Sequence, residues 1–140
     1  MSKISSIFIL LLSSFFMVTT LHGVELDWEH SYSKALADAE RENKIVYLFI
    51  GADRCRYCDK FKKMTLSKYE VIDRMKKDFV LLYMSRDQQE IPDKFEKFGV
   101  PRHYFLTPKG EVIRTEQGIW DSQGWYIILD EVIAEKDDID

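Results

Sequence analysis

The chain has 140 residues, of which 46% are hydrophobic and 14% aromatic, and its formal net charge is −4. This length suits one compact domain, and the slightly acidic balance argues against a basic surface for nucleic acid. Two cysteines, Cys55 and Cys58, are too few for a disulfide-dense mini-protein or for a four-cysteine zinc site.

The first 23 residues read as a secretory signal peptide. Lys3 gives a positive start, residues 4–18 are mostly apolar, and Gly23 is a small residue where cleavage is expected. The mature chain would be residues 24–140, periplasmic or secreted, with no stable membrane insertion after cleavage and in a compartment where disulfides persist. The alternative is an uncleaved anchor, although about fifteen apolar residues are short for a span that needs about twenty.

Helical and strand patterns alternate in the first half of the remaining chain. Residues 28–42 repeat apolar side chains at helical spacing, with Asp27 or Ser31 as the N-cap. Residues 45–50 are an unbroken apolar run, which predicts a strand buried on both faces. A second helix is expected from about Cys55, and a capping-box pattern at 67–70 predicts that it breaks and restarts there, running to about residue 77.

The second half predicts the rest of a sheet and a closing helix. Residues 79–84 form another apolar strand, and residues 92–98 are expected to form a short helix with Pro92 in its first turn. A third strand at 102–107, a turn at 108–110 and a strand at 111–115 make a hairpin. Ser122 caps a helix at 125–135, and the tail at 136–140 is expected to be frayed. The alternation predicts an α/β domain with a mixed sheet of about four strands flanked by helices.

The Cys-x-x-Cys spacing becomes informative through its position. Cys55 and Cys58 follow a buried strand and open a helix, so their sulfur atoms share one helix face and can close a short-loop disulfide. Unpaired N–H groups and the helix dipole at this end favour a thiolate, the attacking species in disulfide exchange. We therefore predict that Cys55 is the nucleophile and that Cys58, one turn further and more buried, resolves the mixed disulfide.

Other uses of the cysteine pair fit less well. A static disulfide across so short a loop would stabilise the fold little. Zinc would need two more ligands, and only His30 and His103 remain in the mature chain, both far away in sequence. Covalent haem attachment requires a histidine directly after the second cysteine, where Asp59 stands. No cofactor is therefore expected.

The chain resembles the thioredoxin superfamily, in particular secreted thioredoxin-like proteins with an extra helix before the first strand. The matching segments are the strands at 45–50 and 79–84, the motif at 55–61, and residues 98–101 and 105–110. The resemblance implies a thioredoxin fold with a cis Val100–Pro101 peptide bond beside the cysteines, whose backbone holds an extended substrate. Tyr57 is similar to the residue found in secreted disulfide isomerases, and with Arg56 it is expected to contact substrate.

One departure from the family concerns the proton of the resolving cysteine. Thioredoxins carry a buried carboxylate six residues before the first cysteine, and Phe49 stands there in this chain. Another base, water or slower exchange is therefore implied. Several cations could gather near the cysteines and favour acidic partners, although a solvated helix face explains them equally well: Arg54, Arg56, Lys60, Lys62, Lys63, Arg102 and His103.

These patterns support a leading function and two alternatives. The leading hypothesis is an exported thiol–disulfide oxidoreductase that acts on protein disulfides, as a reductant, with a membrane-bound thiol reductase as its electron donor. Apocytochromes or misoxidised exported proteins are typical substrates of similar proteins. The alternatives are a non-catalytic peptide-binding module that holds a structural disulfide, and a metal carrier.

Overall fold

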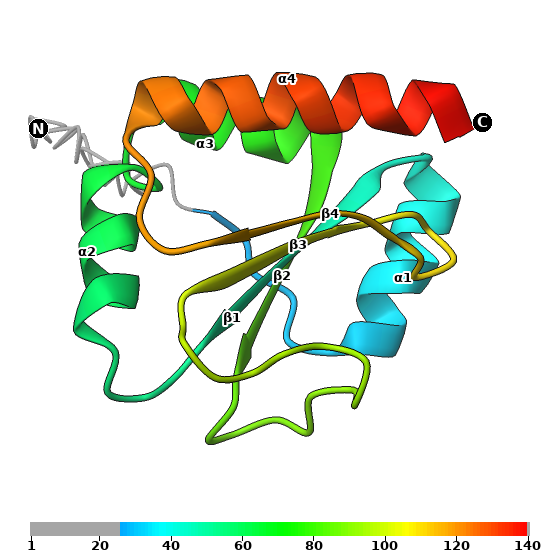
Figure 1. The fold of residues 1–140 in the computed structure, drawn as a ribbon. Coiled ribbons are helices and arrows are strands. Elements are labelled where there is room, and N and C mark those ends of the chain that lie inside the picture. The colour runs from blue at the N-terminus through cyan, green and yellow to red at the C-terminus, as the bar shows by residue number, and fades with distance from the viewer. Residues whose placement is uncertain (1–25, 140) are drawn as a thin grey trace, which may run out of the picture.

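The computed structural model describes residues 26–139, which form one mixed β-sheet with helices on both faces (Figure 1). The expected signal peptide at 1–23 lies outside the described residues. In chain order the elements are α1 (Tyr32–Glu42), β1 (Ile45–Gly51), α2 (Arg56–Met64), α3 (Tyr69–Asp78), β2 (Phe79–Ser85), β3 (Arg102–Leu106), β4 (Val112–Gln117) and α4 (Ser122–Ile139).

The sheet has the strand order β2-β1-β3-β4. Strand β1 runs parallel to β2 and antiparallel to β3, and β3 pairs antiparallel with β4. The predicted four-stranded mixed sheet is confirmed. The parallel pair needs a crossover, which α2 and α3 provide, whereas β3 and β4 need only a short turn. The carboxyl end of β1 therefore leads directly into the cysteine motif.

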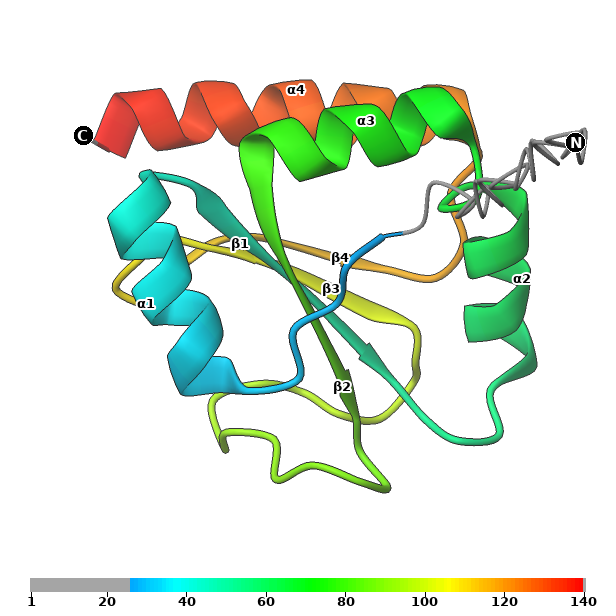
Figure 2. The same ribbon diagram turned by 180° about the vertical axis from the view of Figure 1, so that it is seen from behind.

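Strand β1 is buried on both faces because helices cover both sides of the sheet. Val46, Leu48 and Ile50 belong to an apolar cluster with α1, and Tyr47 and Phe49 belong to a second cluster with α2, α3 and α4. Figures 1 and 2 show α3 and α4 lying side by side along one face, with α1 on the other. Each of these side chains contributes about 1.5–3 kcal/mol when fully buried, which explains the unbroken apolar run.

Three expected helix starts differ from the structure. Helix α1 begins at Tyr32 with Ser31 as its N-cap, because the preceding segment is extended and Glu29 bridges Leu82 in parallel. Helices α2 and α3 are separate, as expected, but the capping box is wrong: Lys68 is the N-cap and makes no side-chain cap hydrogen bond. Helix α4 begins at Ser122, and the carboxylate of Asp121 accepts from the Gly124 N–H at 2.8 Å.

The expected helix at 92–98 does not form. The Phe95 N–H donates to the Pro92 carbonyl in an isolated turn, and the next N–H, of Glu96, donates to the Tyr104 hydroxyl instead of an earlier carbonyl. Burial of Phe95 against Tyr104 and α1 holds this segment as a packed loop. At the other end of the chain, α4 continues to Ile139, where a frayed tail is expected. Within residues 26–139 no helix is both long and apolar enough to cross a membrane.

Candidate active site

The two cysteines form a disulfide at the start of α2. Cys55 is the N-cap residue, and its Sγ accepts a hydrogen bond from the Cys58 N–H at 3.1 Å. The Cα atoms of the pair are 5.2 Å apart. Cys55 is 8% exposed and Cys58 is 1% exposed, so the outer and inner positions match the prediction. A free N–H at a helix terminus stabilises negative charge, so this geometry favours the Cys55 thiolate after reduction.

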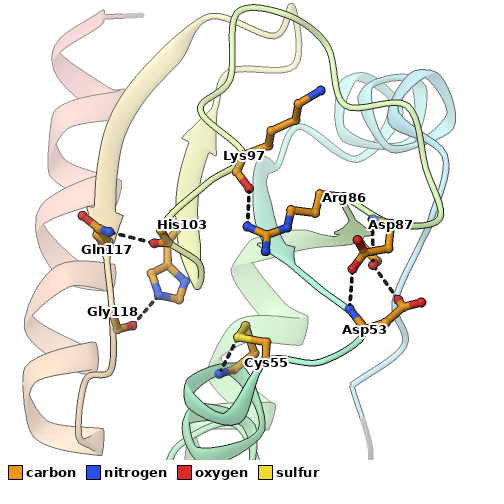
Figure 3. Close-up of a disulfide and its surroundings, with 11 residues drawn as sticks. Asp53, Cys55, Arg86, Asp87, Lys97, His103, Gln117 and Gly118 are labelled. Atoms are coloured by element: carbon orange, nitrogen blue, oxygen red, sulfur yellow. Dashed lines mark hydrogen bonds between the residues drawn. A yellow bond between two sulfur atoms is a disulfide. The ribbon is translucent and has the colours of Figure 1, made fainter.

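Hydrogen bonds fix the loop that carries Cys55 to the end of β2. The Arg86 N–H donates to the Gly51 carbonyl at 3.0 Å, and the Asp53 N–H donates to the Asp87 carboxylate at 2.8 Å. The Asp53 carboxylate in turn accepts from the Ser85 hydroxyl at 2.7 Å and from the Gln88 amide at 2.8 Å. Figure 3 shows Asp53, Arg86 and Asp87 of this cluster beside the disulfide. Hydrogen bonds between the loops that follow two neighbouring strands thus position the first cysteine.

A second loop, at 97–101, approaches the disulfide from β3. The Val100–Pro101 peptide bond is cis, as the resemblance implies. Gly99 has a φ of 65°, and its carbonyl accepts from the Gln117 amide at 2.7 Å. The Arg102 guanidinium donates from Nε to the Phe98 carbonyl at 2.8 Å. Two side chains from β3 and β4 therefore hold the backbone on either side of Gly99.

An open groove lies between the cysteine motif and this loop. It has a volume of about 410 Å³ and a mainly apolar lining. Tyr57, the residue before Cys58, is 53% exposed and forms one side. The other side is formed by residues of the cis-proline loop and the end of β4: Gly99, Val100, Pro101, Gln117, Gly118 and Ile119. Three of the predicted site residues, Tyr57, Val100 and Pro101, therefore line the same groove.

His103 lies beneath this surface and not on it. It is fully buried, and Phe61 and Trp125 pack on it with ring centroids 4.9 and 5.1 Å away. Because a carbonyl only accepts, Nε2 donates to Gly118 at 2.8 Å, and Nδ1 accepts from the Tyr47 hydroxyl at 2.8 Å. Burial lowers the pKa of His103 to about 4. The expectation that His103 joins a surface group of cations is wrong, and its role is to anchor Gly118 below the groove.

Phe49 fills the place of the family's buried carboxylate. Its ring is fully buried and packs against Phe61 and Tyr83, with centroid distances of 6.0 and 5.3 Å. The Lys62 ammonium lies 4.0 Å from the centroid of Tyr83 and 5.4 Å from that of Phe49, and burial lowers the pKa of Lys62. The expected departure from thioredoxins is therefore present, with a half-buried cation on α2 one turn beyond Cys58.

Among residues 26–139 no group of three or more His, Cys, Asp or Glu side chains is placed to hold a metal ion. His30 contacts the Tyr83 carbonyl through Nδ1 at 2.9 Å, and His103 is fully hydrogen-bonded in the core. Neither histidine therefore forms a group of metal-ligating side chains with Cys55 and Cys58.

The structure adds residues to the predicted site and leaves one at its edge. Arg56 does not line the groove; its guanidinium lies over the Tyr57 ring, 5.1 Å from the centroid. The residues that sequence reasoning missed are Gly99, Gln117, Gly118 and Ile119 in the groove, and Arg86 above the disulfide loop. Gly99 and Gly118 precede and follow the β3–β4 hairpin, which is the one sequence signal that could have found them.

The sheet topology and the cysteine pair at the end of β1 define a disulfide oxidoreductase fold of the thioredoxin type. A thioredoxin-like family model matches residues 27–108, more than half of the chain, and the chain belongs to that family. Mouse anterior gradient protein 3 is 24% identical over 86 residues, which are 61% of this chain and 52% of the mouse protein. The chain thus spans about half the length of that relative.

Solved structures show the same fold. A DsbH oxidoreductase superposes with a TM-score of 0.63 at 17% identity, covering 79% of this chain and 85% of that protein. A putative disulphide isomerase from Bacteroides thetaiotaomicron has a TM-score of 0.60 at 27% identity, over 69% of this chain and 84% of its own. The predicted thioredoxin fold is confirmed.

Proposed function

We propose that this protein exchanges thiols and disulfides with protein substrates through Cys55 and Cys58. The observation that carries the proposal is the Cys55 sulfur at the start of α2, hydrogen-bonded by the Cys58 N–H, beside the groove that Tyr57 and the cis Val100–Pro101 loop line. Two proteins of similar structure, an oxidoreductase and a putative disulphide isomerase, support the same chemistry.

In the reductive direction the cycle has two exchange steps. The Cys55 thiolate attacks one sulfur of a substrate disulfide, which forms a mixed disulfide and releases one substrate thiolate. The Cys58 thiol loses its proton and attacks the Cys55 Sγ, which restores the Cys55–Cys58 disulfide and releases the second substrate thiolate. The substrate gains two electrons and the protein loses two, so an external dithiol must reduce the pair before the next turnover.

The groove gives the substrate a place beside the attacking sulfur. An extended segment can pair with the backbone near Val100 while an apolar side chain enters the space between Tyr57 and Ile119. Because backbone pairing tolerates many sequences, this mode suits a protein that accepts several partners. Arg56 lies next to Tyr57 at the rim and can contact the same segment.

We further propose that the protein acts after export, as a reductant supplied by a membrane-bound thiol reductase. The apolar segment at 4–18 supports export, and an oxidising compartment makes a dedicated reductant useful. Apocytochromes and misoxidised exported proteins are candidate substrates. A strong oxidant needs a strongly stabilised Cys55 thiolate. Among residues 26–139 the Cys55 sulfur accepts one hydrogen bond, from the Cys58 N–H, and has no ion-pair partner, so the site does not favour a strong oxidant.

A second candidate function rests on Phe49. Without a carboxylate to take the proton of Cys58, the disulfide could be permanent and the groove could serve as a peptide-binding module. The two functions separate in one assay: reduction of insulin by the protein with a chemical dithiol, compared with the Cys55→Ser variant. Faster insulin reduction by the wild type supports exchange, and equal rates for both proteins support the binding module.

A further inference from the structure

The arginines of this protein divide into two groups by their partners. Residues 26–139 contain seven arginines, and three of them form ion pairs with carboxylates: Arg41, Arg74 and Arg114. The four without a carboxylate partner in this part of the chain are Arg54, Arg56, Arg86 and Arg102. Two of these flank Cys55 in sequence, and the other two hold the loop that leads to the cis proline.

Arg86 and Arg102 converge on the same short segment. Arg86 donates from Nη1 to the Lys97 carbonyl at 3.3 Å and lies over the Phe98 ring, 5.3 Å from its centroid. Arg102 donates to the next carbonyl, that of Phe98. Figure 3 shows the Arg86 guanidinium directed at the Lys97 carbonyl, on the same end of the sheet as the disulfide. Each guanidinium uses one of its five N–H groups in these bonds and keeps the others for a partner.

Three carboxylates on this end of the sheet accept hydrogen bonds from donors other than arginine. Asp53 accepts from Ser85 and Gln88, and Asp87 accepts from the Asp53 N–H. The Glu96 carboxylate accepts from the Phe98 N–H at 2.8 Å. These three carboxylates keep their negative charge but are held within the loops by neutral donors, and none of them pairs with one of the four arginines. The four guanidinium groups are therefore available to a carboxylate of a substrate.

Exposed aromatic surface accompanies this charge. Phe98 is 62% exposed beside Arg86, and Tyr57 is 53% exposed beside Arg56. Guanidinium groups stacked on aromatic rings are held in place, so they lose little conformational freedom when a carboxylate binds. Planar guanidinium forks also match carboxylates in two-point hydrogen bonds.

We propose that this surface, defined by Arg54, Arg56, Arg86 and Arg102, selects protein substrates whose reactive cysteine lies among aspartate or glutamate residues. This proposal depends on the proposed thiol–disulfide exchange and specifies the class of substrate for that reaction. The acidic residues of the substrate face Arg86 and Arg102 while its apolar residue enters the groove beside Tyr57. Complementary charge acts mainly by raising the association rate, an effect that salt weakens.

The test compares disulfide-linked peptides that differ only in the residues flanking the cysteines: glutamates, glutamines or lysines. We expect kcat/KM for reduction to be about tenfold higher for the glutamate peptide than for the glutamine peptide at low salt, and the difference to shrink as salt shortens the screening length to about 8 Å. The double variant Arg86→Gln/Arg102→Gln should lower kcat/KM for the glutamate peptide about tenfold more than for the glutamine peptide, so that the two peptides react at similar rates.

Two controls separate charge from loop structure. Lys109→Gln removes a cation at the opposite end of the sheet, in the β3–β4 turn, and should leave the peptide preference unchanged. Arg86→Lys/Arg102→Lys keeps the charges and should restore most of the preference. Equal rates for glutamate and glutamine peptides, or an equal loss for both in the Gln variant, would overturn the substrate class while leaving exchange intact. Absence of reduction with every peptide would overturn the exchange function itself.

Discussion

The buried His103 makes the stability of this fold sensitive to mild acid. In the folded protein four aromatic rings surround the imidazole and Nδ1 accepts from Tyr47, so an added proton would place an unpaired positive charge in a low-dielectric core. Burial therefore holds the pKa of His103 at about 4, whereas an unfolded histidine titrates near 6.5.

The folded and unfolded pKa values of His103 give the sign and size of the change in stability with pH. Between them the unfolded chain binds a proton that the folded chain does not, so the free energy of unfolding falls as the pH falls from about 6.5 to about 4. At about 1.4 kcal/mol per pH unit this amounts to about 3 kcal/mol, a large part of the stability of a domain of this size. The contribution is fully present above about pH 7.

The measurement is urea unfolding of the oxidised protein from pH 7 to pH 4, followed by the fluorescence of the buried Trp125. His103→Phe removes the titrating group but leaves the Tyr47 hydroxyl without its acceptor, at a cost of about 1–3 kcal/mol that does not vary over this range. Tyr47→Phe/His103→Phe removes both polar groups and serves as the matched control. The carboxylates of Glu29 and Asp38, whose pKa values Lys34 lowers, titrate alike in all three proteins.

We expect the stability of the wild type relative to the double variant to fall by about 3 kcal/mol between pH 7 and pH 4. A difference that stays constant across this range would refute the reasoning, because it would mean that His103 titrates alike in the folded and unfolded states. A difference that grows toward acid would mean that the folded protein binds the proton more tightly, against the observed burial.

Three further predictions concern the cysteines, the groove loop and the substrate surface. Cys58→Ser should accumulate mixed disulfides with substrate proteins, seen by mass spectrometry after acid quenching, whereas Cys55→Ser should form none; equal absence from both variants would contradict the assigned order of attack. Gly99→Ala should lower the free energy of unfolding by about 1 kcal/mol more than Gly118→Ala. Both residues have positive φ, but a methyl group at 99 meets the Gln117 amide at 2.8 Å, whereas a methyl group at 118 meets nothing within 4 Å. Equal losses would show that the Gln117 contact is unimportant. Raising the salt concentration from about 10 to about 150 mM should slow the reduction of acidic substrates several-fold, because salt screens the four arginines of the proposed surface, and a rate independent of salt would argue against their steering role.

Local patterns predicted most of the framework. The apolar run at 45–50 predicted β1 because a strand covered on both faces needs apolar residues at every position, and the structure buries all of them. The start of α1 differs from the prediction because Trp28 continues the apolar helical spacing, although the chain at Glu29 bridges β2. The segment at 92–98 failed for the same reason: packing of Phe95 and the Tyr104 hydroxyl outweighed a local helical pattern.

The candidate site likewise has some residues that local patterns predict and others that only the tertiary structure brings together. The cysteine pair and the cis proline loop could be found from the motif and its family resemblance, since they are short and local. The burial of His103 could not, because its two partners lie 56 residues before it and 15 residues after it, and only the assembled sheet brings them together. The unpaired arginines depend on tertiary structure in the same way: sequence shows the charges but not which carboxylates are already occupied.

The central claim is that the Cys55–Cys58 disulfide cycles, and its reduction potential tests this most directly. The protein is equilibrated with reduced and oxidised glutathione at defined ratios, and the fraction of dithiol is measured by alkylation and mass spectrometry. We predict a reversible couple with a potential above about −300 mV, together with insulin reduction that Cys55→Ser abolishes. A potential well below about −300 mV with no insulin turnover would contradict the proposal and identify the disulfide as structural.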